Sequence, residues 1–396
     1  MNREQFQSLR KILMDKLDLA RELKDEEILE EIDTLILDTL RDSGVSVKEK
    51  AQLRQELFHS VRKLDVLQEL IDDETVTEIM VNGPDAIFIE RDGKLRKWEK
   101  TFTSKEKLED VIQQIVGKCN RVVNESMPIV DARLQNGARV NAVIRPAALN
   151  GPILTIRRFP DTPITMEKLI ALGSLTAECA EFLKTLVKAR YSIIIGGGTG
   201  SGKTTFLSAL SNFIPVDERV ITIEDNAELK IQGIQNLVRL EAKMANTEGA
   251  SSITIRDLIK TALRMRPDRI IVGEVRGGEA VDMLQALNTG HDGSLSTAHA
   301  NSARDMLSRL ETMTLMGIEL PLEAIRRQIA SGVDILIHLG RMRDKSRKVL
   351  EITEICGFEN YEIKTRTLYQ WQEDKGLVQM ASLLNREKLI RAGVTI

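Results

Sequence analysis

Residues 191–210 constrain this chain more than any other stretch. The β-branched run at 192–195 predicts a buried strand. Glycine then dominates up to Lys203, and apolar residues from Phe206 onward follow a helical period. Residues 197–204 therefore match Gly-x-x-x-x-Gly-Lys-Thr between a strand and a helix, the setting of a phosphate-binding loop. A flexible glycine-rich turn is the alternative, but it does not explain why strand, spacing, Lys-Thr pair and helix coincide.

The chemistry of a polyphosphate explains each part of this pattern. Several backbone N–H groups must converge on the phosphates, and Cβ atoms would obstruct that approach. The helix that follows adds free amides and the positive end of its dipole. Lys203 supplies a charge for the β- and γ-phosphates, and the Thr204 hydroxyl can ligate Mg²⁺. ATP and Mg²⁺ are the expected cofactors, and the expected binding residues are Gly197, Gly198, Thr199, Gly200, Ser201, Gly202, Lys203, Thr204 and Thr205.

Composition narrows the setting in which this loop works. The length of 396 residues predicts two or three domains, and 42% hydrophobic with 29% charged residues is ordinary for a soluble globular protein. The net charge of −3 disfavours direct nucleic-acid binding, which usually needs a basic surface. Three distant cysteines without zinc spacing predict free thiols in a reducing cytosol. With no signal peptide and no membrane-length apolar run, a cytoplasmic location is expected.

The hydrophobic pattern divides the chain into three pieces. Residues 1–70 show apolar residues at helical spacing and predict a small helical segment, whose last long helix starts at a capping box formed by Ser46 and Glu49. Apolar positions in this segment include Leu9, Ile12 and Leu13. Such a piece could dock a partner or could be a structural appendage, and the sequence leaves both readings open.

Residues 71–159 predict an α+β domain with a mostly antiparallel sheet. Strand patterns occur at 76–81, 86–90, 94–98, 128–134, 138–144 and 153–159. One helix separates the third and fourth strands, and Thr103 is its expected N-cap.

Residues 160–396 predict the third piece, which follows a proline-containing linker at 159–163. Alternating strands and helices predict a largely parallel sheet with helices on both faces. Strand patterns beyond Pro321 predict an antiparallel extension of this sheet. The expected fold class is therefore α/β.

Polar residues follow three of the strands predicted in this last piece. Glu224 ends the strand at 220–223, with Asp225 and Glu228 close behind, and Glu274 ends the strand at 269–273. Ligand sites of open α/β sheets form at such carboxyl ends. Glu274 can hold Mg²⁺ through water and polarise an attacking water. His299, which follows the third strand, can donate a hydrogen bond to a γ-phosphate or a carboxylate. Solvated loop acids, a strand-capping Glu and a structural His are the plainer readings.

Taken in order, these motifs resemble the secretion superfamily of hexameric ATPases, which power type II and type IV secretion and type IV pili. The matching segments are the phosphate loop at 197–204, an acidic box at 222–228, a Walker B segment at 268–274 and a His box at 297–301. Further matches at 76–83, 130–133, 264–279 and 288–293 place the chain nearest the CpaF branch, which serves Tad/Flp-type pili. The tetracysteine metal insert of many type II secretion ATPases is absent.

The resemblance implies a RecA-like P-loop NTPase domain preceded by a PAS-like α+β amino domain, assembled into a six-membered homo-oligomeric ring. It implies that Arg139 and Arg157 of the amino domain close onto the nucleotide phosphates, although surface charge is the plainer reading. It also implies a Mg-dependent ATPase at the inner face of the cytoplasmic membrane. That motor would act with an inner-membrane platform protein in pilus assembly or secretion and touch the membrane only through partners.

Several functions stay open at this point. Glu274 is the first choice to polarise water and Glu224 the second, and the sequence does not divide their roles. A RecA-like DNA-translocating ATPase is one alternative, which DNA-stimulated hydrolysis would support. A nucleotide-binding switch without turnover is another, which a turnover assay would decide. A GTPase is disfavoured because no Asn-Lys-x-Asp base reader occurs.

Overall fold

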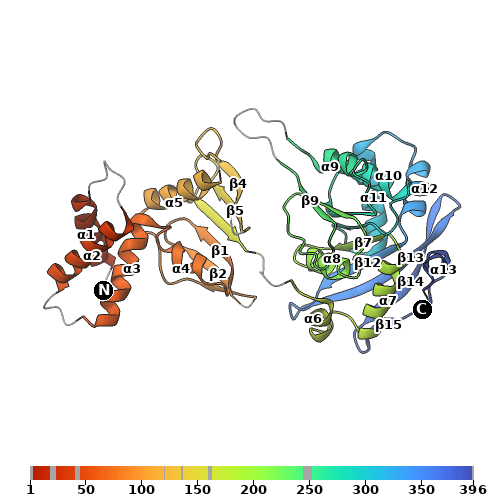
Figure 1. Cartoon of the computed structure of the whole chain (residues 1–396), viewed down its shortest axis with the longest axis horizontal. Coiled ribbons are helices and arrows are strands. Elements are labelled where there is room, and N and C mark those ends of the chain that lie inside the picture. Colours follow the sequence, from red (N-terminus) through yellow and green to blue (C-terminus); the bar gives the residue numbers. More distant parts are fainter. Residues whose placement is uncertain are drawn as a thin grey trace. The chain divides into compact units, whose positions relative to one another are not determined.

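A computed structural model of the chain describes residues 3–17, 24–40, 45–91, 93–119, 121–134, 137–158, 163–243 and 252–394. The chain forms two compact units, Met1–Pro160 and Asp161–Ile396, which run from red to yellow and from yellow-green to blue in Figure 1. The linker predicted at 159–163 lies, except for Pro163, outside the described residues. Each unit is described by itself.

The first unit begins with a bundle of three helices that has its own core. Its members are α1 (Arg3–Lys16), α2 (Asp25–Leu40) and α3 (Val47–Arg62). Leu13, Ile32 and Leu57 are fully buried in this core. The predicted capping box is confirmed, because Ser46 and Glu49 bond to each other's backbone N–H groups at the start of α3. Ile12 was expected in the apolar stripe, but its side chain lies on the exposed side of α1.

A six-stranded sheet forms the rest of the first unit. Its order is β3-β2-β1-β6-β5-β4, and every neighbouring pair is antiparallel, which confirms the predicted pairing. The strands are β1 (Val76–Asn82), β2 (Ile87–Arg91), β3 (Lys94–Lys97), β4 (Ile129–Arg133), β5 (Arg139–Val143) and β6 (Ile153–Arg157).

Two helices accompany this sheet. The apolar stripe of α5 (Lys105–Lys118) is buried in the core of the sheet. The N-cap of α5 is Ser104 and not Thr103, because the Ser104 hydroxyl accepts from the Lys107 N–H. The short helix α4 (Leu67–Asp72) was not predicted, and its Leu67 and Leu70 belong to the same core. The separate core of the helical bundle therefore ends with α3.

The second unit contains a nine-stranded sheet in the order β15-β14-β13-β12-β7-β11-β10-β8-β9. The strands from β12 to β9 pair in parallel, and those from β12 to β15 pair antiparallel, as predicted. The edge strands β9 and β15 were not predicted. The strand bounds are β7 (Ile193–Gly197), β8 (Val220–Glu224), β9 (Leu237–Glu241), β10 (Arg269–Val275), β11 (Leu295–Ala298), β12 (Ile335–Arg341), β13 (Arg347–Glu359), β14 (Glu362–Gln372) and β15 (Gly376–Gln379).

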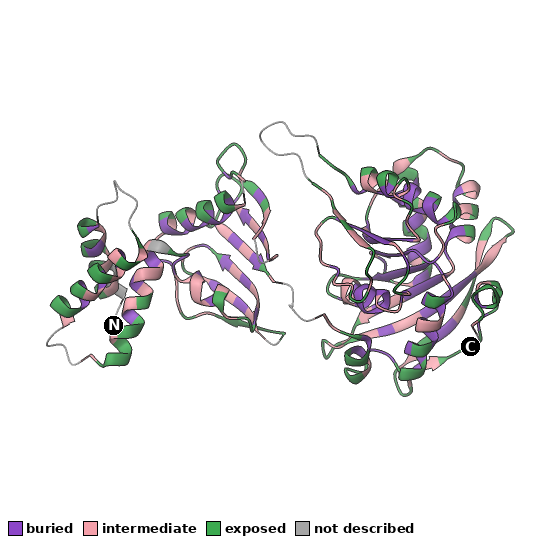
Figure 2. Cartoon of the chain, viewed as in Figure 1, coloured by how far each residue is buried: buried purple, intermediate pink, exposed green. Residues whose placement is uncertain are grey.

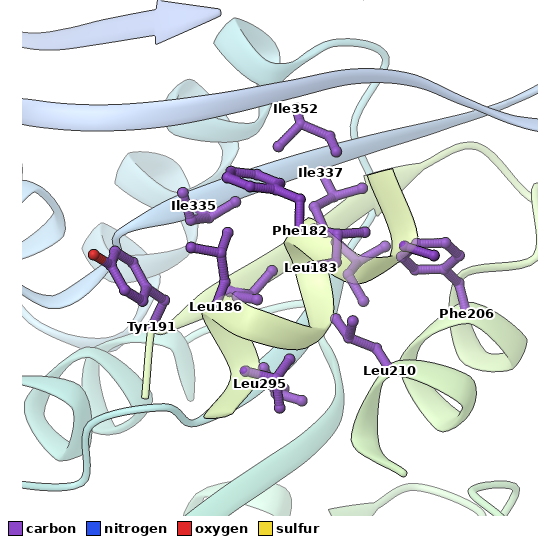
Figure 3. Close-up of a cluster of buried hydrophobic side chains, with 14 of the residues drawn as sticks. Phe182, Leu183, Leu186, Tyr191, Phe206, Leu210, Leu295, Ile335, Ile337 and Ile352 are labelled. Carbon is purple, nitrogen blue, oxygen red and sulfur yellow. The ribbon is translucent and has the colours of Figure 1, made fainter. Parts of the chain in front are cut away.

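Helices cover both faces of this sheet because its central strands are apolar on both sides, as the purple strands in Figure 2 show. Ile193 and Ile195 of β7 face one core, which also contains Phe182 of α7 and Phe206 of α8 (Figure 3). Ile194 faces the other core, to which α9 to α12 contribute. The helices are α6 (Met166–Ala171), α7 (Ala177–Lys188), α8 (Lys203–Ser211), α9 (Ile255–Ala262), α10 (Ala280–Asn288), α11 (Ala303–Gly317), α12 (Leu322–Gly332) and α13 (Glu387–Ala392).

Residues from late in the chain close the amino end of β7. The Tyr191 hydroxyl donates to the carbonyl of Asn385 at 2.6 Å. The Ser192 N–H donates to Asp334 Oδ2 at 2.7 Å, and Lys388 Nζ donates to the same oxygen at 2.7 Å. These bonds fix the start of the strand that leads into the phosphate loop.

Candidate functional site: a phosphate loop beside two acidic strand ends

Strand order explains why distant sequence motifs meet at one edge of the sheet. The phosphate loop follows β7, His299 follows β11, Glu274 lies near the end of β10, and Glu224 ends β8. These four strands are consecutive neighbours in the sheet and run parallel. Their carboxyl ends therefore lie side by side, where ligand sites form in open α/β sheets. The structure thus brings Lys203, His299 and Glu274 into contact.

The phosphate loop runs from the last residue of β7 to the first turn of α8. A Cβ on Gly197 would lie 2.4 Å from Ser201 Oγ and 2.6 Å from the carbonyl oxygen of Leu339, so only glycine fits there. Gly200 and Gly202 have φ values of 72° and 91°, which glycine adopts without strain. Ser201 Oγ donates to the Gly198 carbonyl at 2.9 Å. Gly198, Thr199 and Gly200 are exposed, as a ligand-binding loop requires.

Lys203 is the buried cation of this loop. Its Nζ donates to the carbonyl oxygens of Gly197 at 3.0 Å and Gly198 at 3.2 Å. Burial lowers the pKa of Lys203, and the neighbouring Glu274 opposes that effect. A buried ammonium whose nearest acceptors are uncharged carbonyl oxygens is incompletely compensated, so an anionic group entering the loop would relieve the cost of its burial.

A line of polar contacts leads from Lys203 to the acidic end of β10. His299 Nδ1 lies 3.4 Å from Lys203 Nζ, and His299 Nε2 lies 2.8 Å from Glu274 Oε1. The second contact is short but not aligned as a hydrogen bond, so Glu274 Oε1 is a buried oxygen without a hydrogen-bond partner. Glu274 Oε2 accepts from Arg276 Nε at 2.8 Å and from a terminal Arg276 nitrogen at 2.6 Å. Arg276 also reaches Asp225 at 3.6 Å.

The surroundings of His299 favour its neutral form. Burial lowers the pKa of His299, the Glu274 carboxylate opposes that effect, and the Lys203 charge adds to it. With Nδ1 accepting from the Lys203 ammonium, the proton of a neutral ring lies on Nε2 and faces Glu274. Thr297 steadies this edge from β11, since its hydroxyl donates to the Gly273 carbonyl at 2.7 Å. His299 therefore bridges the lysine of the loop and the carboxylate of β10.

Glu224 has a different environment from Glu274. Its side chain is only 3% exposed, and Oε1 accepts from the backbone N–H groups of Glu228 and Leu229, both at 2.9 Å. Oε2 is buried without a hydrogen-bond partner. Burial raises the pKa of Glu224 to about 7, although the two backbone N–H groups pull it down. The carboxyl group packs against Gly273, where a Cβ would lie 2.9 Å from Glu224 Cγ. Glu224 thus anchors the loop after β8.

The site also has the composition expected for a magnesium nucleotide. Thr204 lies half-buried in the first turn of α8, and the unpartnered Oε2 of Glu224 is an orphaned acceptor at the same sheet edge. Among the described residues there is no group of three or more His, Cys, Asp or Glu side chains that could hold a metal ion. Mg²⁺ bound with a nucleotide keeps several waters and uses one or two protein ligands plus phosphate oxygens. The residues present therefore fit that mode of binding.

Arg139 and Arg157 belong to the first unit, where the structure makes them neighbours. They are directly opposed across β5 and β6, and Arg133 of β4 is directly opposed to Arg139. Their neighbours in the same strands, Val140 and Ile156, lie in the core, and successive side chains of a strand point to opposite faces. The arginines therefore lie on the other face of the sheet. Arg157 is exposed and Arg139 half-buried. One row of arginine residues thus crosses three strands.

Comparisons with known proteins agree with this architecture. Residues 61–383 match the family model described as type II/IV secretion system protein. The chain belongs to this family. It is 34% identical over 326 residues to a putative conjugal transfer protein of Mycobacterium tuberculosis, covering 81% of this chain and 91% of that one. It is also 34% identical over 306 residues to the type IV secretion system protein VirB11 of Brucella suis, covering 70% and 84%.

A solved structure has a similar fold. The pilus retraction motor PilT with bound ADP has a TM-score of 0.53 at 19% identity, covering 83% of this chain and 86% of that one. At this identity the likeness concerns the fold, which is that of RecA-like secretion ATPases. In the described part of the chain, the helices are too short or too polar to span a bilayer.

Two residues of the site were not predicted from the sequence. Arg276 neutralises Glu274 and Asp225, and its position two residues after Glu274 at a strand end was a usable signal. Arg347 donates to the Gly200 carbonyl of the phosphate loop at 3.0 Å. Nothing in the local sequence indicates that contact, because it joins residues 147 positions apart.

Proposed function

We propose that the chain is a Mg-dependent ATPase of the secretion family that works as a cytoplasmic motor at the inner face of the membrane. The observation that supports this best is the continuous line from Lys203 through His299 to Glu274. It joins a phosphate-binding cation to a carboxylate that retains an acceptor oxygen. A site that only binds nucleotide needs the first group but not the second.

In the proposed reaction, Lys203 transfers its hydrogen bonds from the Gly197 and Gly198 carbonyls to the β- and γ-phosphates of ATP. The loop amides and the N-terminus of α8 bind the same phosphates. Thr204 and the acids at the strand ends would hold a bound Mg²⁺, which would supply positive charge to neutralise the phosphates. Glu274 orients and polarises the attacking water through Oε1.

His299 senses the γ-phosphate, because its ring contacts both Lys203 and Glu274 and moves if either changes partner. Glu224 is the second candidate for the polarising carboxylate. Its two backbone N–H bonds favour an anchoring role, and Glu274 remains our first choice.

The proposed motor is a homo-hexamer that acts with an inner-membrane platform protein, in pilus assembly of the Tad/Flp type or in secretion. Closure of the amino domain would bring Arg139 and Arg157 to the phosphates and supply the mechanical stroke. Their opposed positions on β5 and β6 support this, because one movement would deliver both guanidinium groups. Arginine matches phosphate oxygens in a bidentate geometry and keeps its charge at any working pH.

The deciding experiment measures phosphate release by the purified full chain with ATP, with and without Mg²⁺, beside Lys203→Ala. We expect Mg-dependent turnover in the parent and none above background in the variant, whose thermal transition should stay close to the parent's. Absence of turnover in a parent that binds ATP would favour the switch without hydrolysis. Strong stimulation by duplex DNA would favour the DNA-translocating motor.

A further inference from the structure

The hairpin between β12 and β13 lies beside the phosphate loop. Strand β12 pairs in parallel with β7, and Leu339 is directly opposed to Gly197. The Leu339 carbonyl oxygen would lie only 2.6 Å from a Cβ on Gly197. The chain continues two residues further to Arg341, turns, and returns as β13 from Arg347. The base of this hairpin is thus packed against the first glycine of the loop.

One side chain of the hairpin spans the left-handed part of the loop. Arg347 Nε donates to the Gly200 carbonyl at 3.0 Å. The Cδ atom of the same side chain is 3.4 Å from where a Cβ of Gly202 would lie. Gly200 and Gly202 are the two loop glycines with positive φ. Arg347 therefore holds the turn through a hydrogen bond to Gly200 and through packing of its stem against Gly202.

This contact controls the direction in which a loop amide points. In a trans peptide the carbonyl and the following N–H point in opposite directions. With the Gly200 carbonyl held toward Arg347, the Ser201 N–H points away from the hairpin. The structure directs that N–H to the Gly198 carbonyl at 3.3 Å, the same oxygen that accepts from Lys203 Nζ. The Ser201 amide and the Lys203 ammonium thus both point to the Gly198 carbonyl oxygen.

The hairpin is also a local source of positive charge. Residues 341–347 contain Arg341, Arg343, Lys345 and Arg347 against one acid, Asp344. Asp344 is engaged by the Ser346 N–H and hydroxyl at 2.9 and 2.6 Å. Arg341 lies close as well, with a guanidinium nitrogen 3.9 Å from the Cβ position of Gly200. Cations at this distance raise the potential that an approaching polyphosphate meets.

We infer that Arg347 is a positioning residue that holds the phosphate loop, from the same subunit, in the shape that accepts nucleotide. This rests on the proposed nucleotide binding at residues 197–204. Because Arg347 acts on the loop and not on the γ-phosphate, it supports ADP and ATP alike. Its removal should therefore weaken binding of both nucleotides and raise KM, while kcat at saturating ATP changes little.

The experiment compares the full chain with Arg347→Ala and Arg347→Met, using titration with a fluorescent ADP analogue and steady-state hydrolysis of ATP. Arg347→Met keeps the stem that packs on Gly202 and removes only the donor and charge. We expect both variants to raise the ADP Kd and the ATP KM about tenfold, the loss typical of a hydrogen bond from a charged group, with kcat within about twofold. Arg343→Ala, an exposed residue of the same hairpin, is the matched control and should behave as the parent.

Three results would overturn the inference while leaving the proposed function intact. The first is a parent-like ADP Kd and ATP KM in a folded Arg347→Met. The second is an equal loss in Arg343→Ala, which would assign the effect to the general charge of the hairpin. The third is a loss of kcat with unchanged KM, which would place Arg347 in the chemical step. Failure of the parent itself to bind nucleotide would instead refute the proposed function.

Discussion

Glu224→Gln should raise the Tm of the second unit above that of the parent at alkaline pH and leave it almost equal to the parent's at acid pH. The parent buries a carboxyl group whose Oε2 has no partner, and burial raises the pKa of Glu224 from its ordinary 4.5 to about 7. The amide of glutamine is neutral at every pH, and its oxygen can still accept from the Glu228 and Leu229 N–H groups. The substitution therefore removes the ionisation and keeps the anchor.

The sign and size follow from linkage. A carboxyl group with a raised pKa binds its proton more tightly in the folded state, so it favours folding below pH 4.5, and that contribution is lost as pH rises through about 7. The difference of roughly 2.5 pKa units corresponds to about 3 kcal/mol at 1.36 kcal/mol per unit. For a domain of this size, 1 kcal/mol shifts Tm by about 2–4 °C. Because the unfolded carboxyl group is already largely ionised at pH 5, about 2.5 kcal/mol of this difference falls between pH 5 and pH 8.5. The Tm of Glu224→Gln relative to the parent should thus rise by about 5–10 °C over that range.

Differential scanning calorimetry without nucleotide, at half-unit steps of pH, measures this difference directly. Any fixed cost of burying the amide shifts all points equally and cancels from the pH dependence. Glu373→Gln, in the exposed turn between β14 and β15, makes the same change of charge and should track the parent throughout. If the Tm difference for Glu224→Gln varies by less than about 2 °C over this range, the buried carboxyl group is not the cause we assign.

Three further predictions concern the mechanism. Glu274→Gln should bind ATP like the parent but stall hydrolysis by at least about a hundredfold, as expected for loss of a general base; parent-like phosphate release would make Glu224 the better candidate. Arg139→Ala and Arg157→Ala should each lower turnover strongly and weaken ATP binding more than ADP binding, measured by nucleotide titration; equal losses for both nucleotides would indicate a structural role. Removing residues 1–62, a boundary that keeps Leu64 in the core of the sheet, should spare basal hydrolysis and weaken docking to the proposed membrane partner. Co-sedimentation with membranes that contain the proposed platform protein measures the docking, and loss of ATP binding in a folded truncation would contradict this separation.

The phosphate loop and the strands around it could be predicted because their chemistry is local. A loop that binds phosphate needs its glycines, lysine and threonine at fixed spacing, and a strand buried on both faces needs a continuous apolar run. These requirements show in the sequence without knowledge of the fold. The order of the strands then brings His299 and Glu274 together, because β11 and β10 are neighbouring parallel strands and β11 in turn pairs with β7.

The parts that escaped prediction depend on long-range contacts or on weak patterns. Strand β9 is an edge strand of five residues with a half-exposed pattern, so its sequence lacks the apolar run of its neighbours. Arg269 was assigned to a strand, but its full burial depends on Glu218, which receives two hydrogen bonds from the guanidinium group. Sequence spacing does not reveal such a pairing, since the two residues are 51 positions apart. The contact between Arg347 and Gly200 escaped for the same reason.

The bonds that close the amino end of β7 also set an order of events during synthesis. Asn385, whose carbonyl oxygen accepts a hydrogen bond from the Tyr191 hydroxyl, is 194 residues beyond Tyr191. At about 5–20 residues per second, a ribosome needs roughly 10 to 40 s to travel that distance. During this interval the strand that leads into the phosphate loop has been made, but neither Asp334 nor Asn385 is at first available to hold its start. The second unit therefore cannot complete these bonds until Asn385 and Lys388 have left the ribosome, and until then the start of its apolar central strand lacks the partners that hold it.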